Sequence, residues 1–344
     1  MTHEIRFGVC LEVFDEWVKL AELGDKVGLQ DIWLRADMAY QDSFSDITFA
    51  LTETERARFF PYANSVFLRH PVLLASGIAN MDRLRPGRVG AAYCSAGFET
   101  SVGLHIPDED SVQACREAIE ITRLLWTGES ITYKGRHWEL TDVRLQYQAR
   151  SGIPIWLATR GKKFKLAGEL ADGIITHGKA GRFLKQMGRH LEEGSKVSGR
   201  DHRKIERAIV LPLLITGPED KERARRSLRG MLGAFVGGEY SLDWLDTFGI
   251  SIEEVRPLRE YIRLKGFSPG IGELVSDNLL SRLIEGYAVV GTPEECINEI
   301  EEMRRGGATV VVPLIIKSWF PEASDARRYM QTYAEKIVQS FGEQ

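Results

Sequence analysis

The segment 154–175 (PIWLATRGKKFKLAGELADGII) begins as an apolar strand and continues as a helix, with three cations and a glycine at the junction. The junction consists of Thr159, Arg160, Gly161, Lys162 and Lys163. Backbone N–H groups at a helix start bind anions, and an arginine can clamp a phosphate through two parallel hydrogen bonds. Cations at a helix N-terminus oppose the helix dipole unless an anion answers them. The pattern therefore predicts a phosphate or carboxylate site, with lysine side chains extending into water as the alternative.

Small residues and potential proton donors follow other strand-like segments. Ala91–Gly103 (AAYCSAGFETSVG) would let the backbone approach a flat ligand closely. Cys94 would need activation to act as a nucleophile, so we interpret it as a small residue that packs at the ligand. Asp37 and Glu99 could each act as a general acid or base if burial raised the pKa, and a solvated loop carboxylate is the alternative. His177 could donate to a ligand or take protons, and a structural role is its alternative.

The composition of the chain limits the class of protein to which it can belong. The 344 residues carry a net charge of −4, which gives no basic surface for nucleic acid. Four scattered cysteines without a CxxC fit a reduced cytoplasm better than a disulfide framework, and the seven histidines show no spacing that would predict a metal site. The first residues, MTHEIRFGVCLEVF, lack the apolar segment of a signal peptide, and no apolar run could span a bilayer. We expect a cytoplasmic protein.

Strand-like segments alternate with helical ones along most of the chain. Eight segments are strand-like: Ile5–Leu11, Asp31–Arg35, Phe59–Phe67, Gly87–Tyr93, Pro154–Thr159, Gly173–Thr176, Ala208–Ile215 and Thr309–Ile315. Nine segments are helical: Asp15–Val27, Asp46–Glu55, Pro71–Leu84, Asp110–Trp126, Lys162–Ala171, Arg182–Val197, Glu219–Phe235, Pro293–Arg305 and Ala323–Phe341. This alternation predicts an α/β fold of the (β/α)₈ TIM-barrel type, with a doubly wound open sheet as the alternative. In such a barrel the chemistry lies at the C-terminal ends of the strands.

Residues 236–290 interrupt the alternation, and we interpret them as an insertion after the seventh strand within a single domain, 1–344. Trp244, Phe248, Phe267 and Tyr287 suggest an aromatic cover over the barrel, and core packing explains them equally well. The segment 292–295 (TPEE) has the pattern of a capping box, and we expect it to be structural.

Four segments together resemble the bacterial-luciferase-like superfamily, and the closest branch looks like methylenetetrahydromethanopterin reductase. They are RHPVLLASGIANMDRLRPGRV (69–89), REAIEITRLLWTGESITYKGRHWEL (116–140), ELADGII (169–175) and VVGTPEECINEIEEMRRGGATVVV (289–312). The resemblance runs along nearly the whole chain in register. It implies a (β/α)₈ barrel, usually dimeric, that binds a flavin such as FMN or the deazaflavin coenzyme F420 in its C-terminal mouth.

The resemblance also implies where such a cofactor would lie. Its phosphate would meet the loop after the fifth strand, and its flat ring would lie near Tyr62, Ala63 and Asn64, where the family's cis peptide aligns with Tyr62-Ala63. Dimers of the family form through the region of helix Pro71–Leu84, which carries Leu74, Ile78 and Met81 at helical spacing. An ordinary buried face against the barrel is the alternative for that stripe.

The chain departs from the family pattern at several positions. Ala92–Gly97 replaces a glycine-rich loop that ends in aspartate, Cys10 stands where the first strand ends in an acid, and Ala36-Asp37 replaces an Asp-His pair. We expect an oxidoreductase that transfers hydride between F420 or a flavin and a small organic substrate, with Asp37, Glu99 or His177 at the proton. The alternatives are an FMN-dependent monooxygenase and a barrel that binds a ligand without catalysis.

Overall fold

The computed structural model describes residues 4–12, 16–35, 42–96, 104–106, 110–159, 161, 163–238 and 245–342. Within these ranges the main sheet has nine strands, all parallel, in the order β3-β2-β1-β13-β10-β9-β8-β5-β4. The strands are β1 (Arg6–Leu11), β2 (Asp31–Arg35), β3 (Arg58–Tyr62), β4 (Asn64–Ser65), β5 (Ala91–Cys94), β8 (Ile155–Ala158), β9 (Gly173–Thr176), β10 (Glu206–Leu211) and β13 (Val310–Ile315).

Strands β3 and β4 are two halves of one strand that is interrupted at Ala63, so the nine strands count as eight in the barrel wall. The lower half approaches the next strand through Phe59, whose N–H donates to the Arg88 carbonyl at 2.7 Å and whose carbonyl accepts from Gly90 at 3.1 Å. The upper half pairs with β5. The sheet therefore closes on itself, which confirms the expected TIM barrel. The third strand was expected over Phe59–Phe67 with an interruption at Pro61, and the structure interrupts it at Ala63 instead.

Aromatic side chains fill the middle of the barrel. Trp33 and Phe60 stack with ring centroids 4.0 Å apart, and Trp156 meets Trp33 edge-on at 5.1 Å. Glycines make room for these rings, because a Cβ at Gly173 would overlap the Trp156 indole and a Cβ at Gly90 would overlap the Phe60 ring. The barrel is therefore a packed core up to the level at which the strands end.

Four charged side chains close the lower, N-terminal end of the barrel. Arg6, Asp31, Arg58 and Glu206 alternate in register with interior residues of their strands, so all four point inward. Arg58 donates to both carboxylate oxygens of Asp31 at 2.7 and 3.0 Å, and Arg6 hydrogen-bonds Glu206 through both terminal nitrogens. Asp31 is fully buried, so its charge depends on Arg58 for compensation.

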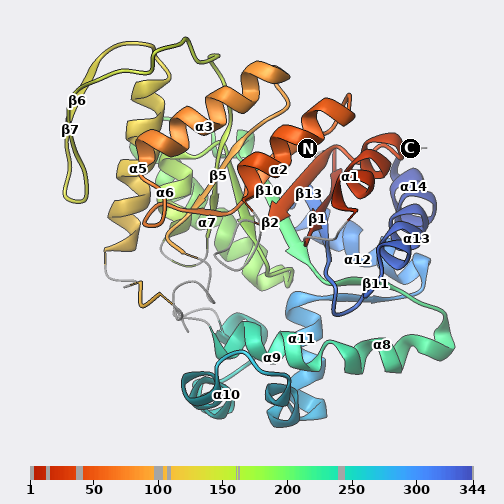
Figure 1. Ribbon diagram of the computed structural model, residues 1–344. Helices are drawn as coiled ribbons and strands as arrows, with labels where there is room; N and C mark the ends of the chain where they lie inside the picture. The colour runs from red at the N-terminus through yellow and green to blue at the C-terminus, as the bar shows by residue number, and fades with distance from the viewer. Residues whose placement is uncertain are drawn as a thin grey trace.

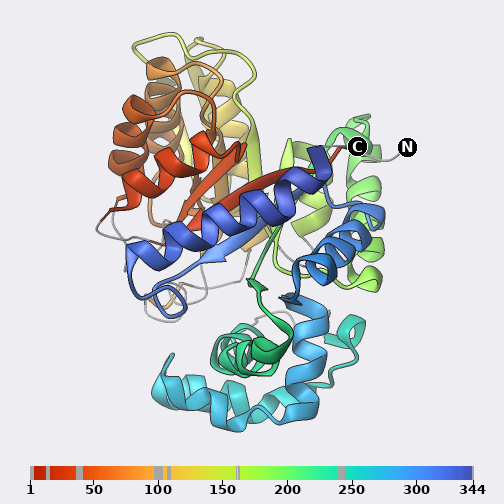
Figure 2. The ribbon, with the colours of Figure 1, turned by 90° about the vertical axis from the view of Figure 1, so that its right-hand side faces the viewer.

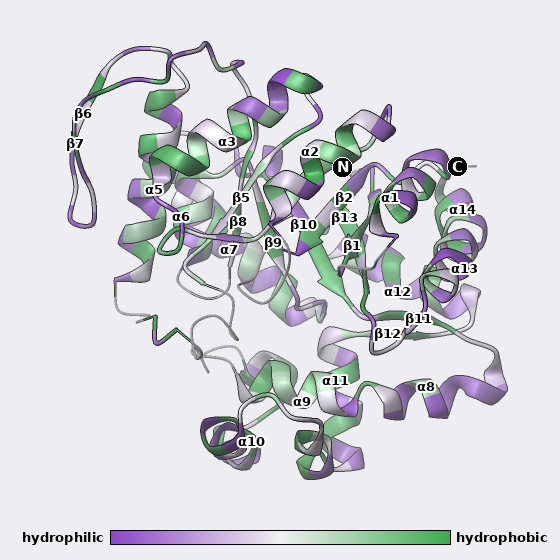
Figure 3. Ribbon diagram, viewed as in Figure 1, coloured by the Kyte–Doolittle hydropathy of each residue, from purple (hydrophilic) through white to green (hydrophobic). Residues whose placement is uncertain are grey.

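Helices cover the outside of the barrel, as Figure 1 shows. They are α1 (Trp17–Lys26), α2 (Ser43–Glu53), α3 (Pro71–Leu84), α5 (Ser111–Leu125), α6 (Lys163–Leu170), α7 (Gly181–Ser198), α12 (Pro293–Arg305), α13 (Ala323–Tyr333) and α14 (Gln339–Gly342), the last two joined by a π-helical turn over Ala334–Val338. The strands are largely hydrophobic and the outer helix faces hydrophilic (Figure 3). A hairpin of β6 (Ile131–Lys134) and β7 (Glu139–Val143) follows α5. No helix in the described part of the chain has both the length and the apolar character that crossing a membrane requires.

The side chains test two predictions about helices, the capping box at residues 292–295 and the apolar stripe on α3. The capping box is present at the start of α12, where Thr292 accepts from the Glu295 N–H and the Glu295 side chain accepts from the Thr292 N–H. On α3, Leu74, Ile78 and Met81 are buried within the single chain, so this stripe is the ordinary face against the barrel. The large apolar side chains that α2 and α3 leave exposed are Phe49 and Leu73, each 61% exposed, and Leu84 at the end of α3, 44% exposed.

The predicted seventh strand is two strands in two different sheets. β10 ends at Leu211, Pro212 follows, and β11 (Leu213–Ile215) pairs with β12 (Val289–Gly291) outside the barrel. Proline has no N–H for a ladder, which explains why the barrel strand stops there. The helix expected over Glu219–Phe235 is also broken, at Leu228, into α8 (Lys221–Ser227) and α9 (Arg229–Gly237).

A helical cluster follows between β11 and β12. It comprises α8, α9, the short helix η3 (Leu245–Phe248), α10 (Ile252–Lys265), η4 (Pro269–Leu274) and α11 (Asp277–Tyr287). Figure 2 shows this cluster below the barrel, reached from it by a short extended connection. We refer to it as the cover cluster.

Candidate active site

The C-terminal ends of the barrel strands bring most of the predicted site residues to one mouth. Tyr62, Ala63 and Asn64 lie where β3 gives way to β4, Cys94 ends β5, and Thr159, Gly161 and Lys163 follow β8. His177 directly follows β9. Asp37, Glu99, Arg160 and Lys162 lie outside the described residues, so their predicted roles stay predictions.

Lys163 turns toward the neighbouring strand end instead of into water. Its ammonium group donates to the Ser95 hydroxyl at 2.9 Å, across 68 residues of sequence. Gly161 has a φ of +62°, a backbone conformation that suits glycine, and its carbonyl accepts from the Phe164 N–H at 3.1 Å in the first turn of α6. A cation, a hydroxyl and the start of a helix therefore meet at one point, and this donor set matches a phosphate group.

Tyr62 and His177 form a directed hydrogen-bond chain in the mouth. The Tyr62 hydroxyl lies 3.0 Å from Nε2 of His177, and Nδ1 of His177 lies 2.9 Å from the Val210 carbonyl oxygen. A carbonyl can only accept, so Nδ1 carries the proton, and in the neutral ring Nε2 accepts from the Tyr62 hydroxyl. The lone pairs of the Tyr62 oxygen are thereby the acceptor that this chain presents to a ligand.

The bend between β3 and β4 is held by the side chains around it. The Tyr62-Ala63 peptide bond is cis, as the resemblance implied. The Asn64 amide donates to the Pro61 carbonyl at 3.1 Å, and the Cys94 thiol lies 3.5 Å from the Ala63 carbonyl. Both side chains are more than nine-tenths buried. Asn64 and Cys94 therefore shape the bend, which agrees with a packing role for the cysteine.

The cover cluster reaches the mouth through α9 and α11. The Phe235 ring lies 5.0 Å from the His177 ring, and the Lys179 N–H donates to the Gly286 carbonyl at 2.8 Å. Of the expected cover aromatics, Phe248 and Tyr287 pack against each other at 4.5 Å and are buried. These two side chains are core residues of the cover cluster, while Trp244 lies outside the described residues.

Glu12, Ser95 and Phe235 are site residues that sequence reasoning missed. Glu12 lies two residues beyond Cys10, so strand alternation points both to the same inner face, and its carboxylate accepts from the Lys317 N–H at 2.6 Å. The resemblance implied an acid at the position of Cys10, and Glu12 places a carboxylate two residues further along the same face. Alternation along β1 was the signal that could have identified it. No sequence signal pairs Ser95 with Lys163.

Within the described ranges, no group of three or more His, Cys, Asp and Glu side chains is arranged to hold a metal ion. The donor groups at the mouth are instead a lysine, hydroxyls, an imidazole and ring faces. Such a set can bind a phosphate and hold a flat ring, and it can move a proton between a ligand and His177.

Comparison with known proteins gives a consistent picture. Residues 2–310 match the model of the luciferase-like monooxygenase family. A 5,10-methylenetetrahydromethanopterin reductase of Archaeoglobus fulgidus is 24% identical over 323 residues, which cover 94% of this chain and 93% of that protein.

Two solved structures share the fold. The coenzyme F420-dependent tetrahydromethanopterin reductase of Methanopyrus kandleri superposes with a TM-score of 0.83 at 22% identity, covering 98% of this chain and 99% of that one. The oxygenating constituent of 3,6-diketocamphane monooxygenase from Pseudomonas putida, solved with FMN, superposes with a TM-score of 0.68 at 17% identity, covering 98% of each chain.

Proposed function

The chain belongs to the luciferase-like monooxygenase family, and from that premise we propose that it is an oxidoreductase that binds coenzyme F420 or a flavin in the barrel mouth. It transfers hydride between that cofactor and a small organic substrate. The observation that carries the proposal is the contact of Lys163 with Ser95 beside Gly161, because it places a cation and a hydroxyl at the start of a helix. The structurally similar tetrahydromethanopterin reductase of Methanopyrus kandleri is coenzyme F420-dependent, which favours F420 as the first cofactor to test.

The residues present fit such a cofactor. Lys163, Ser95 and the backbone N–H groups at the start of α6 would hold its phosphate. The Tyr62-Ala63 bend and Asn64 would support the flat ring on one side, and Phe235 of the cover cluster would exclude water from another. When bound, the deazaflavin or flavin ring supplies the hydride chemistry.

The proton would be handled by Tyr62 and His177. The hydroxyl of Tyr62 accepts a hydrogen bond from a ligand donor and passes its own proton toward Nε2 of His177. The Val210 carbonyl holds the ring in the tautomer that leaves Nε2 as acceptor. In the oxidative direction this arrangement takes a proton from the substrate, and in the reductive direction the same chain returns it. Asp37, Glu99 and Glu12 are the carboxylates that could handle the proton in place of Tyr62 and His177, and substitution of each would compare their effects on turnover.

A titration of the purified protein with F420 and with FMN tests the proposal. Binding of either cofactor at micromolar concentration, followed by hydride exchange with an added acceptor, is the expected result. The proposal fails if neither cofactor changes its absorbance or fluorescence on mixing.

The FMN-dependent monooxygenase is the second candidate, favoured by the family to which the chain belongs. It predicts oxygen consumption with reduced FMN, which an F420-dependent dehydrogenase would not show. A barrel that binds without catalysis would bind a cofactor and turn over neither oxygen nor any hydride acceptor.

We also propose that the protein is a homodimer in the reducing cytoplasm. Phe49 on α2 and Leu73 on α3 are large apolar side chains left exposed on neighbouring helices, which suits an interface. All four cysteines lie in the described residues, are buried and form no disulfide, which fits a compartment that keeps thiols reduced. A monomer in sedimentation at micromolar concentration would contradict the dimer.

A further inference from the structure

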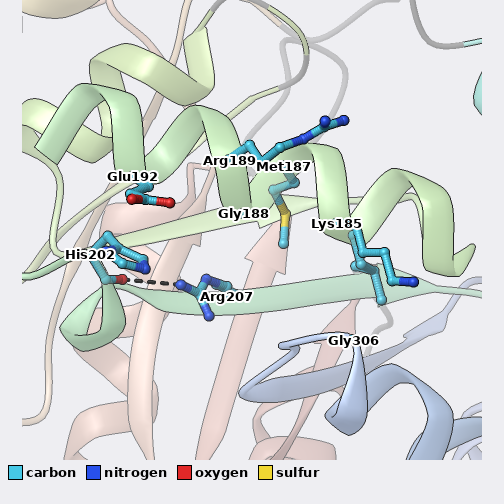
Figure 4. Close-up of a pocket in the computed structure, with 9 residues that line it drawn as sticks. Lys185, Met187, Gly188, Arg189, Glu192, His202, Arg207 and Gly306 are labelled. Carbon is cyan, nitrogen blue, oxygen red and sulfur yellow. Dashed lines mark hydrogen bonds between the residues drawn. The ribbon is translucent and has the colours of Figure 1, made fainter.

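A cavity of about 300 Å³ lies on the outer side of the barrel, away from the mouth. Figure 4 shows it between α7, the start of β10 and the turn that follows α12 at Gly306. Leu184 and Met187 are buried and form its apolar floor. Arg207 lies at one end, and as the second residue of β10 it belongs to the N-terminal end of the barrel.

Arg207 is an arginine almost without exposure, and none of the acidic residues that the structure describes forms an ion pair with it. Its side chain points outward from β10, and the residue is only 7% exposed. Two of its five N–H donors are used on carbonyl oxygens, that of Gly307 at 3.2 Å and that of His202 at 3.1 Å. Its Nε–H is buried with no hydrogen-bond partner in the described part of the chain.

Comparison with Arg58 shows what Arg207 lacks. Both guanidinium groups are largely desolvated, but Arg58 forms ion pairs with Asp31 and Glu206. Burial lowers the pKa of Arg207, and an arginine stays protonated nevertheless. Carbonyl groups at the C-terminal end of α12 compensate part of the guanidinium charge through the helix dipole. A buried charge that only carbonyl dipoles compensate remains unfavourable until an anion approaches it.

The other charges around the cavity are mainly positive. Lys185 and Arg189 line it, and both also line a second hollow of about 600 Å³ that continues along α7. Both residues are exposed, so their charged ends lie where the cavity meets solvent. Glu192 is the carboxylate on the lining, and it is paired with Lys196 at 2.8 Å. An anion that enters therefore meets two cations before it reaches Arg207.

We propose that this cavity binds a phosphate group, carried by a small molecule or as the free ion, with the phosphate accepting from the terminal N–H groups of the Arg207 guanidinium that the two carbonyls leave unused. The carbonyls of His202 and Gly307 hold the guanidinium in place. Lys185 supplies charge at the entrance, and Leu184 and Met187 offer an apolar surface to the rest of an organic ligand. The site is separate from the mouth and does not depend on the cofactor proposed there.

Phosphate-induced stabilisation of the full chain tests the site, provided that binding at the mouth is removed first. A Lys163→Ala background serves this purpose. We expect inorganic phosphate to raise the melting temperature of Lys163→Ala protein more than chloride does at equal ionic strength. Adding Arg207→Gln should weaken phosphate binding roughly tenfold, since a charge-assisted hydrogen bond is lost.

Lys185→Glu in the same background is the second variant, because Lys185 is exposed and its replacement leaves the fold intact. It should also reduce the phosphate response. Glycerol 3-phosphate in place of inorganic phosphate distinguishes an ester ligand from the free ion by which of them binds more tightly. The proposal is overturned if phosphate acts no better than chloride, or if both Arg207→Gln and Lys185→Glu leave its effect unchanged.

Discussion

The Tyr62 hydroxyl lies 3.0 Å from Nε2 of His177, although 115 residues separate the two in sequence. The contact joins the third strand of the barrel to the loop after the sixth. Its direction is fixed from below by the Val210 carbonyl, which accepts from the opposite ring nitrogen at 2.9 Å. A proton acceptor is thereby oriented at the mouth before any ligand arrives.

Removal of the Tyr62 hydroxyl should lower turnover without removing the cofactor. In Tyr62→Phe we expect the turnover number to fall by about 10²-fold or more, as for loss of a general acid or base. The dissociation constant of the cofactor should change little, because the ring packing against Trp33 is retained. Steady-state kinetics beside a fluorescence titration separates the two quantities. Tyr133→Phe, which removes a hydroxyl bonded to Glu120 in the hairpin, is the matched control and should be silent.

Loss of the Lys163 ammonium group should weaken cofactor binding. Lys163→Met removes a charge-assisted contact with the phosphate, so the dissociation constant should rise roughly tenfold or more. Lys165→Met is the control, since the Lys165 ammonium group forms an ion pair with Glu193 of α7 at 2.7 Å. If the Lys163 and Lys165 variants bound the cofactor equally tightly, the cofactor phosphate would not bind at this loop.

A methyl group at position 173 should destabilise the barrel from inside. The Cβ of Gly173→Ala would overlap the Trp156 indole, which is fully buried and cannot move aside. Overpacking of this kind costs about 1–3 kcal/mol of unfolding free energy. Gly188→Ala on α7 meets open space and should instead be neutral or stabilising by up to about 1 kcal/mol. Urea unfolding of both variants measures the difference.

The ion pairs at the base of the barrel should make stability fall in acid. Burial alone would raise the pKa of Glu206, but the hydrogen bond from Arg6 and the charges of Arg58 and Arg6 outweigh it and hold that pKa below its usual value. The unfolded chain therefore binds a proton at a higher pH than the native one, so stability rises with pH through this window.

Unfolding free energy measured across pH tests this point. Wild-type protein should lose stability progressively as the pH falls below about 4.5, where unfolded glutamate begins to protonate. Glu206→Gln should be less stable near neutral pH by about 2 kcal/mol and should show a flatter acid limb. Parallel pH profiles for the two proteins would show that Glu206 is not a source of the acid sensitivity.

Alternating apolar patterns were enough to predict the barrel, because each strand and its helix are local features. The ends of β2, β9, α3 and α12 agree with the predicted bounds, since caps, prolines and glycines mark them in the sequence. Pro212 can be read in the sequence, but the sequence alone did not indicate that the barrel strand ends there. Only the pairing of Leu213–Ile215 with Val289–Gly291 shows that the chain leaves the barrel there.

The site was harder to predict than the fold for a physical reason. Side chains such as Lys163 and Ser95 meet because barrel closure brings two strand ends together, and nothing local to either residue indicates the other. His177 was identified by its type and position, but its tautomer depends on a carbonyl 33 residues away. The chemical role of a residue can therefore be proposed from sequence, but which of its atoms donates or accepts a proton follows only from the three-dimensional contacts.

The parallel pair β11 and β12 has a consequence for how this protein can change. Everything between Ile215 and Val289 leaves from and returns to one pair of parallel strands, so the barrel holds the cover cluster as an insertion anchored at a single place. Length and sequence within that loop can vary without altering the distance that any barrel strand must bridge. A different cover cluster can therefore be carried by an unchanged barrel, and the Phe235 ring beside His177 marks where the present one meets the mouth.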